Sequence, residues 1–304
     1  MKPRTESLLS GLEAEGFRWS LVPIGRLNDL QSEIENWRRE VGFDPDLERD
    51  YLSVFSFSPP DDFADAKSIL EVAAPVPQID VAFHRKGKPL LLRIPPTYLH
   101  DSDAAVERLI FESINPAGYR IVRARLPEKL LAVRSGLAKY GRNNIAYVQG
   151  MGSFHRPIAF FSDLPCERDS WHEETTLKRC KDCLICWKAC PTGAIPNDRF
   201  LIRADRCITF LNERPGEFPE WLDPAAHHCV VGCMRCQRAC PENRGVADWV
   251  EARGSFTEEE TELLLGGAAV GNHLQAETRK KLEDLGLAEY SAFLDRNLRV
   301  LLHD

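Results

Sequence analysis

Ten cysteines lie in the second half of the chain, at spacings suited to metal binding. Seven fall in two short runs, CKDCLICWKACP and CMRCQRACP, which hold Cys180, Cys183, Cys186, Cys190, Cys233, Cys236 and Cys240. A disulfide framework would spread its cysteines, whereas this clustering is typical of metal thiolates. Three closely spaced cysteines can bind three corners of a cubane iron–sulfur cluster, and the cysteine before proline then reaches a second cubane.

A structural zinc site is the alternative, but four thiolates satisfy zinc and leave the two C-x3-C-P tails unexplained. If the cysteine before proline in each run binds the cluster of the other run, the first cluster is held by Cys180, Cys183, Cys186 and Cys240. Three corners of the second cluster are then held by Cys190, Cys233 and Cys236. The regular position for the last ligand is occupied by Val230. Spacing alone leaves Cys207 and Cys229 as equal candidates. Cys166 has no neighbour at ligand spacing and is interpreted as an ordinary cysteine.

Composition narrows the class of protein. The 304 residues include 39 basic and 46 acidic side chains, for a formal charge of −7, and each thiolate-bound cluster adds about −2. This acidic balance argues against an obligatory nucleic-acid partner, which usually leaves a basic footprint. No apolar run is long enough to span a membrane, and the N-terminus lacks an apolar signal core. We therefore expect a cytoplasmic protein.

The residues before the cysteines alternate between helical and strand patterns. Apolar spacing predicts helices near 5–17, 27–43 and 101–115, the last opening on capping candidates at 101–103. Strands are predicted at 68–77 and 119–126, with a hairpin over 81–94 around a Lys-Gly-Lys turn. A helix over 128–141 and two strands within 144–164 complete this mixed α/β layer.

The rest of the chain has a simpler pattern. A polar linker follows residue 164, a strand-like stretch at 199–203 and a helical run flank Cys207, and Thr257 and Glu260 match a capping box. Two short helices are predicted within 277–302. We expect three segments, at 1–165, 166–250 and 251–304.

Three stretches, CKDCLICWKACPTGAI, IRADRCITFLNE and VGCMRCQRACPEN, resemble the double-cluster domain of epoxyqueuosine reductases and, more distantly, that of reductive dehalogenases. In that pattern an arginine-cysteine-isoleucine segment supplies the last ligand, so the resemblance selects Cys207 and leaves Cys229 spare. The resemblance extends upstream through AVRSGLAKYGRNNIAYVQGMGSF and covers about 130–240. It implies an α+β fold with a nitroreductase-like N-terminal α/β domain, a ferredoxin-like double-cluster domain and short C-terminal helices.

The resemblance also implies cobalamin, a corrinoid bound base-off between the N-terminal domain and two [4Fe–4S] clusters. The nearer cluster would reduce the cobalt, and a low-potential donor of the ferredoxin or flavodoxin type would supply the electrons. By motif position, the residues near the corrinoid would be Arg134, Ser135, Gly136, Tyr140, Gly141, Arg142, Asn143, Asn144, Ser153 and Thr209.

One departure from the family concerns the proton donor. Epoxyqueuosine reductases carry a proton-donating aspartate ahead of this segment, and counting back from Glu128 places Val122 there, which cannot transfer a proton. Tyr98 and His100 in IPPTYLHD are the replacement candidates, and Glu128 is a third. The histidines that could contact a corrinoid are His155, His227 and His228.

Three functions follow from these observations. The first is a cobalamin-dependent, double-cluster reductase whose substrate is not the epoxyqueuosine tRNA, because the aspartate is missing. The second is an electron-transfer protein of the ferredoxin type with no chemistry of its own. The third is a reductive activator of another corrinoid enzyme. The partner would accordingly be a small molecule or a corrinoid protein.

Overall fold

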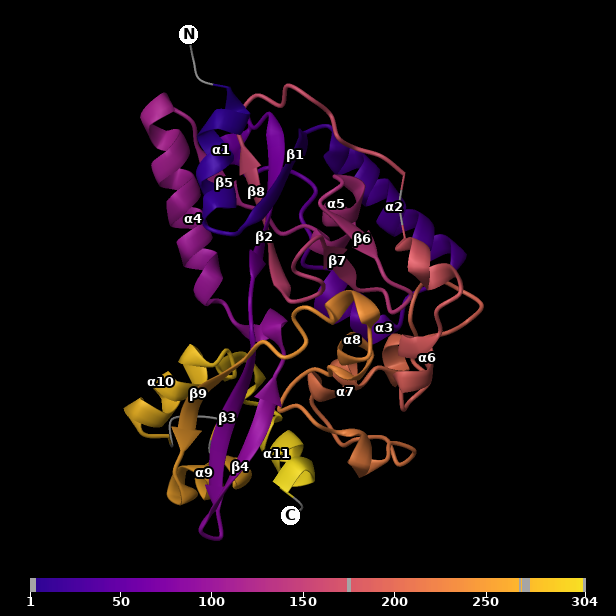
Figure 1. The fold of residues 1–304 in the computed structure, drawn as a ribbon, viewed down its shortest axis with the longest axis vertical. Helices are drawn as coiled ribbons and strands as arrows, with labels where there is room; N and C mark the ends of the chain where they lie inside the picture. Colours follow the sequence, from indigo (N-terminus) through magenta and orange to yellow (C-terminus); the bar gives the residue numbers. More distant parts are fainter. Residues whose placement is uncertain (1–3, 174–175, 268, 270–273, 303–304) are drawn as a thin grey trace. The chain divides into compact units, whose positions relative to one another are not determined.

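The computed structural model describes residues 4–173, 176–267, 269 and 274–302 (Figure 1). They form two compact units, unit 1 with Met1–Pro75 and Ser102–Asp182, and unit 2 with Val76–Asp101 and Cys183–Asp304. This division differs from the three predicted segments, because residues 76–101 belong with the C-terminal part of the chain. The physical reason is a strand pairing within unit 2 that joins segments far apart in the sequence.

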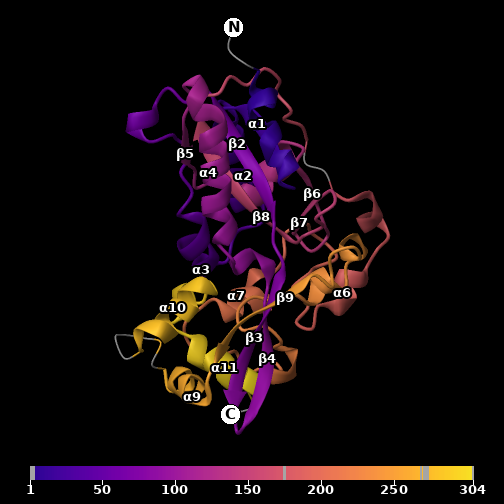
Figure 2. The same ribbon diagram turned by 60° about the vertical axis from the view of Figure 1, so that its left-hand side comes forward.

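Unit 1 contains an antiparallel sheet in the order β1-β2-β8-β5. Its strands are β1 (Arg18–Pro23), β2 (Ser68–Pro75), β8 (His155–Ser162) and β5 (Ile121–Arg123). Alternate residues of β2, among them Leu70 and Val72, pack with α1 (Thr5–Ala14) and α4 (Asp101–Ile114) in one core. Figures 1 and 2 both show these two helices on the same face of the sheet. The predicted helices and strands of this layer are confirmed, except for the helix over 128–141.

The other elements of unit 1 are α2 (Arg26–Glu40), the short α3 (Pro45–Leu47), α5 (Glu128–Arg134), and a hairpin of β6 (Ala138–Tyr140) and β7 (Ala146–Val148). Helix α5 contacts β2 and β8. The prediction of one helix over 128–141 is wrong, because the helix ends at Arg134. Gly136 has a φ of +84°, a left-handed conformation that ends helices and favours glycine, and the chain continues as β6.

Unit 2 has a three-stranded sheet in the order β4-β3-β9. Strands β3 (Gln78–Arg85) and β4 (Lys88–Ile94) form the predicted hairpin, with Lys86 and Gly87 both at positive φ, and β9 (Val250–Phe256) pairs parallel to β3. The core on this sheet includes Phe83 and Phe256 with α9 (Glu258–Leu265), α10 (Ala276–Asp284) and α11 (Leu294–Leu302). The predicted capping box at Thr257 and Glu260 is present.

The cysteine-rich part of unit 2 contains three short helices, α6 (Ile185–Ala189), α7 (Ile208–Asn212) and α8 (Arg235–Arg238), with a small core of Ile208, Leu211, Leu222 and Ala226. The strand predicted at 199–203 is absent, since those described residues pair with no strand. The helical run after Cys207 is confirmed as α7. Among the described residues, no helix is long and apolar enough to cross a membrane.

Candidate double-cluster and corrinoid sites

The two cysteine runs build similar local structures. In each run the two cysteines before the tail, Cys183 and Cys186 or Cys233 and Cys236, lie in a loop and in the short helix that follows it, and these helices, α6 and α8, pack against each other. Each run ends with a cysteine before proline, Cys190 or Cys240, at φ/ψ of −79°/111° and −72°/127°. A residue before proline avoids the helical region, so both tails leave their helices in an extended conformation. The C-x3-C-P pattern thereby turns each tail away from its own loop.

Thiols of the predicted second set lie near one another in unit 2, although the described part of the chain holds no group of three or more Cys, His, Asp or Glu side chains placed to bind a metal ion. Burial raises the pKa of the Cys233 thiol, and the neighbouring Cys207, Cys229 and Cys190 raise it further. Burial likewise raises the pKa of Cys207, and Cys190 adds to the increase. Neighbouring thiols are the type of ligand that an iron–sulfur cluster requires.

Hydrogen-bond donors surround the Cys207 thiol. The backbone N–H groups of Phe210 and Thr209 and the Thr209 hydroxyl all favour the ionised form, opposing the effect of burial on its pKa. Such donors stabilise a metal-bound thiolate and tune its potential. Thr209, which the resemblance places beside the corrinoid, contacts the Cys207 thiol in the structure.

Cys229 has a different environment. It is 1% exposed, and its backbone forms an isolated parallel bridge with Arg93 of β4, next to which the Val230 N–H donates to the Arg93 carbonyl over 2.9 Å. Burial raises the pKa of its thiol to about 12. Cys229 is thus fixed to the sheet of unit 2, while its neighbour Val230 lies in the hydrophobic core.

Unit 1 contains Cys180 of the predicted first set. The Arg142 backbone N–H donates to the Cys180 Sγ over 3.4 Å, and the Arg142 guanidinium donates to the Cys180 carbonyl over 2.9 Å. These bonds connect the predicted corrinoid segment to a predicted cluster ligand. The thiol of Cys166 instead donates to the carbonyls of Arg168 and Leu21, and burial raises its pKa, as expected for an ordinary cysteine.

The beginning of the predicted corrinoid segment makes contacts within the protein. Arg134, the last residue of α5, donates two hydrogen bonds to one carboxylate oxygen of Glu33 on α2, at 2.6 and 2.8 Å. Both side chains are largely buried, at 15% and 11% exposure. The hydroxyls of Ser135 and Ser20 lie 2.7 Å apart. Arg134 and Ser135 therefore join elements of unit 1 whether or not a corrinoid is present.

The turn between β6 and β7 contains four more of the predicted residues. A Cβ on Gly141 would lie 2.5 Å from Asn143 Oδ1 and 2.6 Å from Tyr147 Cε2, so the packing there requires glycine. Asn144 has a φ of 58°, a conformation that asparagine tolerates, and Tyr140 is buried at the end of β6. The Asn143 amide donates to the Tyr147 hydroxyl over 3.0 Å, while its buried Oδ1 has no partner among the described residues.

Two further buried groups lie near the start of β8. Ser153 is buried, and the His155 ring is held by a 3.1 Å contact between Nε2 and the Ala146 carbonyl. Burial lowers the pKa of His155 to about 4, which keeps the ring neutral at pH 7, and its buried Nδ1 has no partner among the described residues. The unpaired acceptors Asn143 Oδ1 and His155 Nδ1 fit a segment that receives a polar ligand.

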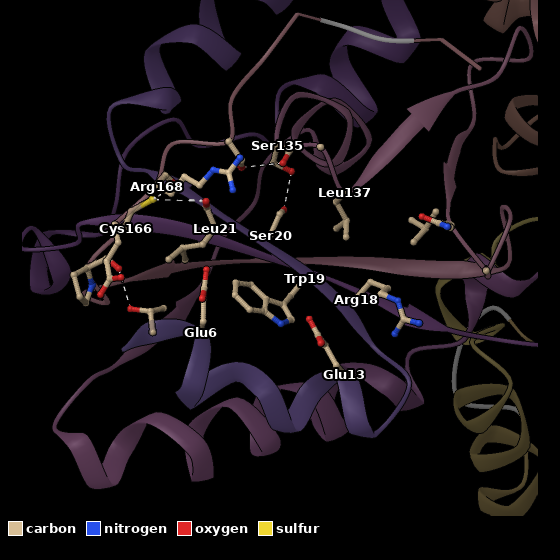
Figure 3. A pocket seen from close by; sticks show the side chains of 18 residues that line it. Glu6, Glu13, Arg18, Trp19, Ser20, Leu21, Ser135, Leu137, Cys166 and Arg168 are labelled. Carbon is tan, nitrogen blue, oxygen red and sulfur yellow. Dashed lines mark hydrogen bonds between the residues drawn. The ribbon is translucent and has the colours of Figure 1, made fainter. Parts of the chain in front are cut away.

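Unit 1 also contains a cavity of about 750 Å³, shown in Figure 3. It is lined by α1, β1, residues 135–137 and 148–150, and residues 165–170. Of the predicted corrinoid residues, only Ser135 and Gly136 line it. Trp19 lies in its wall, and its buried indole N–H has no partner in the described part of the chain. The cavity is large enough for a small organic ligand.

The predicted proton donors have different surroundings. Tyr98 is buried in the core of unit 2, where its hydroxyl donates to Glu213, and burial raises its pKa well above the usual value. Its ring packs edge-on against Tyr290 at 5.5 Å. These contacts indicate a packing role for Tyr98, whereas His100 is exposed two residues further on. Val122 lies in β5, opposite Phe161 of β8.

A pair of carboxylic acids in unit 1 is a feature that the sequence analysis missed in part. Glu71 on β2 is fully buried, and neither of its oxygens has a partner among the described residues. Burial raises its pKa well above 4.5, and the nearby Glu128 raises it further. Burial also raises the pKa of Glu128 to about 7, against the opposing effects of Arg123 and Arg156. Glu71 is the sole charged residue in the apolar run SILEVAAP, and this isolated charge was the sequence signal that could have indicated a buried acid.

The remaining histidines support the second cysteine loop. His228 Nε2 accepts from the Met234 backbone N–H over 3.0 Å, and the His227 ring packs on Phe218 at 4.4 Å. Burial lowers the pKa of each to about 4, with nearby arginines adding to the shift. Both rings are therefore neutral at pH 7 and hold backbone in place.

Known proteins match the cysteine-rich segment of this chain. The 4Fe-4S double cluster binding domain family matches residues 179–243. Epoxyqueuosine reductase from Staphylococcus aureus is 31% identical over 121 residues, which are 40% of this chain and 30% of that protein. The enzyme from Salmonella typhimurium is 35% identical over 88 residues, 29% of this chain and 22% of that protein. The matches thus span less than a third of these relatives' own length.

Solved structures show the same fold over more of the chain. Epoxyqueuosine reductase from Streptococcus thermophilus has a TM-score of 0.67 at 18% identity, covering 98% of this chain and 81% of that one. The Bacillus subtilis enzyme has the same score at 22% identity, covering 98% and 80%, and is described with its aspartate catalytic loop swung out of the active site. A further epoxyqueuosine reductase structure, with a TM-score of 0.64 at 20% identity, contains a tRNA stem loop.

Fold and segment together define a class, that of α+β proteins with a double [4Fe–4S] cluster-binding segment followed by C-terminal helices. Within that class, the chain is similar to epoxyqueuosine reductases, in sequence over part of their length and in fold over most of it. The predicted fold class is confirmed.

Proposed function

We propose that this chain is a double-cluster, corrinoid-dependent reductase. The observation that carries the proposal is the match of residues 179–243 to a double-cluster domain family, within which the Cys207 thiol accepts hydrogen bonds and lies near Cys190 and Cys233. Cys207 completes the second set with Cys236. The first set is Cys180, Cys183, Cys186 and Cys240, as the C-x3-C-P crossing pattern requires.

The corrinoid part of the proposal rests on residues 134–155 of unit 1. Asn143 Oδ1 and His155 Nδ1 are unpaired acceptors there, and Arg142 binds Cys180 through its backbone and side chain. A bound corrinoid would supply a strongly reducing cobalt centre. The chain would supply thiolates for the clusters, a neutral His155 and fixed amide groups that orient the ligand.

The substrate is proposed to differ from the epoxyqueuosine tRNA. Val122 occupies the position where the family's aspartate is expected, and it lies in a strand with no acid to donate. Glu128 of unit 1 has a pKa of about 7, which suits proton transfer at neutral pH. We propose Glu128 as the proton source, in preference to Tyr98, whose proton is held by Glu213.

Anaerobic reconstitution tests the proposal in two steps. Iron analysis should give about eight atoms per chain for two [4Fe–4S] clusters. The reduced protein should then bind cobalamin, measured by equilibrium dialysis and by the change in the corrinoid's visible spectrum. Eight iron atoms without cobalamin binding would favour the electron-transfer alternative, because a ferredoxin-type protein needs the clusters and no corrinoid.

A further inference from the structure

A second hollow lies in unit 2, beside the predicted second cluster. Its volume is about 290 Å³, and its lining includes Pro191, Thr192, Arg206, Trp221, Asp223 and Arg235. Three of these residues directly adjoin predicted ligands in the chain, namely Cys190, Cys207 and Cys236. A molecule bound in the hollow would therefore contact residues that flank three ligands of the predicted second cluster.

The cationic side chains of the hollow are held in place by the protein. Arg206 donates to the Thr192 carbonyl over 2.9 Å, and its guanidinium lies over the Trp221 ring at 5.0 Å. Arg235 donates to the Ala225 carbonyl over 3.1 Å. Because these side chains are already held in one conformation, they lose less conformational entropy when a partner binds.

The surface combines an exposed aromatic ring with positive charge. Trp221 is 48% exposed, although tryptophan is usually well buried. Asp223 is the one carboxylate among the residues that line the hollow, and its oxygen caps its own turn by accepting from the Ala225 N–H over 2.9 Å. Arg238, one turn along α8 from Arg235, is exposed as well. Tryptophan and arginine are the residue types most enriched at the energetic centres of interfaces.

We infer that this hollow, which we name the arginine–tryptophan port, is the docking site for an acidic one-electron carrier protein that reduces the second cluster. The inference rests on the proposed function for the presence of the clusters, and the choice of the second cluster as the acceptor also uses the proposed corrinoid site. In the step, the reduced carrier loses one electron, and a [4Fe–4S]²⁺ cluster gains it and becomes [4Fe–4S]⁺. No proton or further reactant is needed.

Two observations favour a carrier protein over a nucleic acid. Arg142 ties Cys180 of the first set to the segment with the predicted corrinoid residues, so the first cluster serves the corrinoid and the second is left to receive electrons. A nucleic-acid substrate would have to reach the corrinoid, whereas the port adjoins ligands of the second cluster. Electron-transfer complexes have small interfaces and low affinity, and complementary charge on the two partners mainly raises their association rate.

The test uses the reconstituted full chain with a pre-reduced acidic ferredoxin, and follows cluster bleaching by stopped flow. Arg235→Glu should lower the second-order rate about tenfold at low salt, because it reverses a charge in the port. Trp221→Ala should lower it several-fold. Asp223→Asn keeps an oxygen for the turn and removes the opposing charge, so it should raise the rate about twofold. High salt should reduce the effects of both charge variants.

The matched control is Lys280→Glu, which makes the same change in net charge on α10, where Lys280 pairs with Asp284 at 3.0 Å. Its rate should equal that of the wild type. Calorimetric titration with oxidised ferredoxin should show the same ranking in affinity. Reduction by dithionite and iron content should be unchanged in every variant. Trp221 and Asp223 adjoin no predicted ligand in the chain. If Arg235→Glu lowers the iron content, the Trp221 and Asp223 variants alone decide whether the port binds the carrier.

Several results would overturn the inference. One is that the Trp221 and Asp223 variants match Lys280→Glu in both rate and affinity. Another is that the port variants weaken binding of a tRNA stem loop and leave ferredoxin reduction unchanged, which would make the surface a nucleic-acid interface. Failure to bind cobalamin would refute the proposed reductase alone, since cluster bleaching is measured without it.

Discussion

Two regions of this molecule are predicted to bind cofactors, and their polar groups are used differently. In residues 190–236 of unit 2, thiols lie near one another and accept hydrogen bonds from backbone N–H groups. In residues 134–144 of unit 1, Arg134 pairs with Glu33 and Ser135 with Ser20, so the side chains mainly satisfy one another. The thiols of the first region are the groups that an iron–sulfur cluster would use as ligands. The second stabilises the fold by itself and leaves a few acceptors, such as Asn143 Oδ1, for a ligand.

The largest effect is expected at the second cluster. Cys207→Ala should reduce the iron content from about eight to about four atoms per chain, because it removes one of four thiolates. Cys229→Ala, the matched control, should keep eight, since Cys207 is the proposed fourth ligand of the second cluster and the buried Cys229 is spare. Iron analysis and the electron paramagnetic resonance of the reduced protein would measure both. The reverse result would assign the last corner to Cys229.

A smaller effect is expected at the ion pair of unit 1. Arg134→Ala should lower the free energy of unfolding by about 3 kcal/mol, because it leaves the Glu33 carboxylate largely buried and unpaired. The control Arg120→Ala breaks an exposed pair with Asp65 and should cost less than about 1 kcal/mol.

The double variant Glu33→Leu/Arg134→Met separates scaffold from cofactor binding at this pair. It should recover most of the stability lost in Arg134→Ala, as measured by chemical denaturation. If stability returns while cobalamin affinity stays low, Arg134 contacts the corrinoid as well. Equal cobalamin affinity in the double variant and the wild type would make it a scaffold residue alone.

The close packing at Gly141 predicts a further loss of stability. Gly141→Ala should lower the free energy of unfolding by about 1–3 kcal/mol, because the new methyl group meets Asn143 and Tyr147. Gly25→Ala is the control, since a Cβ there meets nothing within 4 Å. Thermal denaturation of the apoprotein would compare the two. A Gly141 variant with unchanged stability and weaker cobalamin binding would indicate a ligand contact in place of packing.

The smallest effect concerns the buried acid of β2. The folded-state pKa of Glu71 lies above 4.5, so the unfolded state loses its proton first and wild-type stability falls as the pH rises from 4.5. Glu71→Gln cannot ionise, and it should gain about 1 kcal/mol on the wild type between pH 5 and pH 8.

A control variant separates this slope from that of its neighbour. Glu128→Gln should remove only the part of the slope between 4.5 and about 7, the pKa of Glu128 in the folded protein. Chemical denaturation at several pH values would show both effects. An unchanged slope in Glu71→Gln would mean that the carboxylate is ionised and solvated in the folded state.

The sequence predicted best those features that local spacing determines. The Lys86–Gly87 hairpin and the Thr257 capping box depend on residues a few positions apart, and both are present. The overlong helix over 128–141 failed because Gly136 adopts a left-handed conformation where the apolar pattern continues. The burial of Glu71 was not predictable from one strand, because it depends on α5, more than fifty residues later.

The parallel pairing of β3 with β9 has a consequence for the order of folding. Gln78 lies beside Val250, so the sheet of unit 2 cannot be completed on the ribosome until nearly the whole chain has been made. Unit 1 ends at Asp182 and can close earlier. During that interval, β3 has one unpaired edge, which invites pairing with other chains. Slow synthesis through residues 183–256 should therefore increase aggregation, and chaperones that cover strand edges should relieve it.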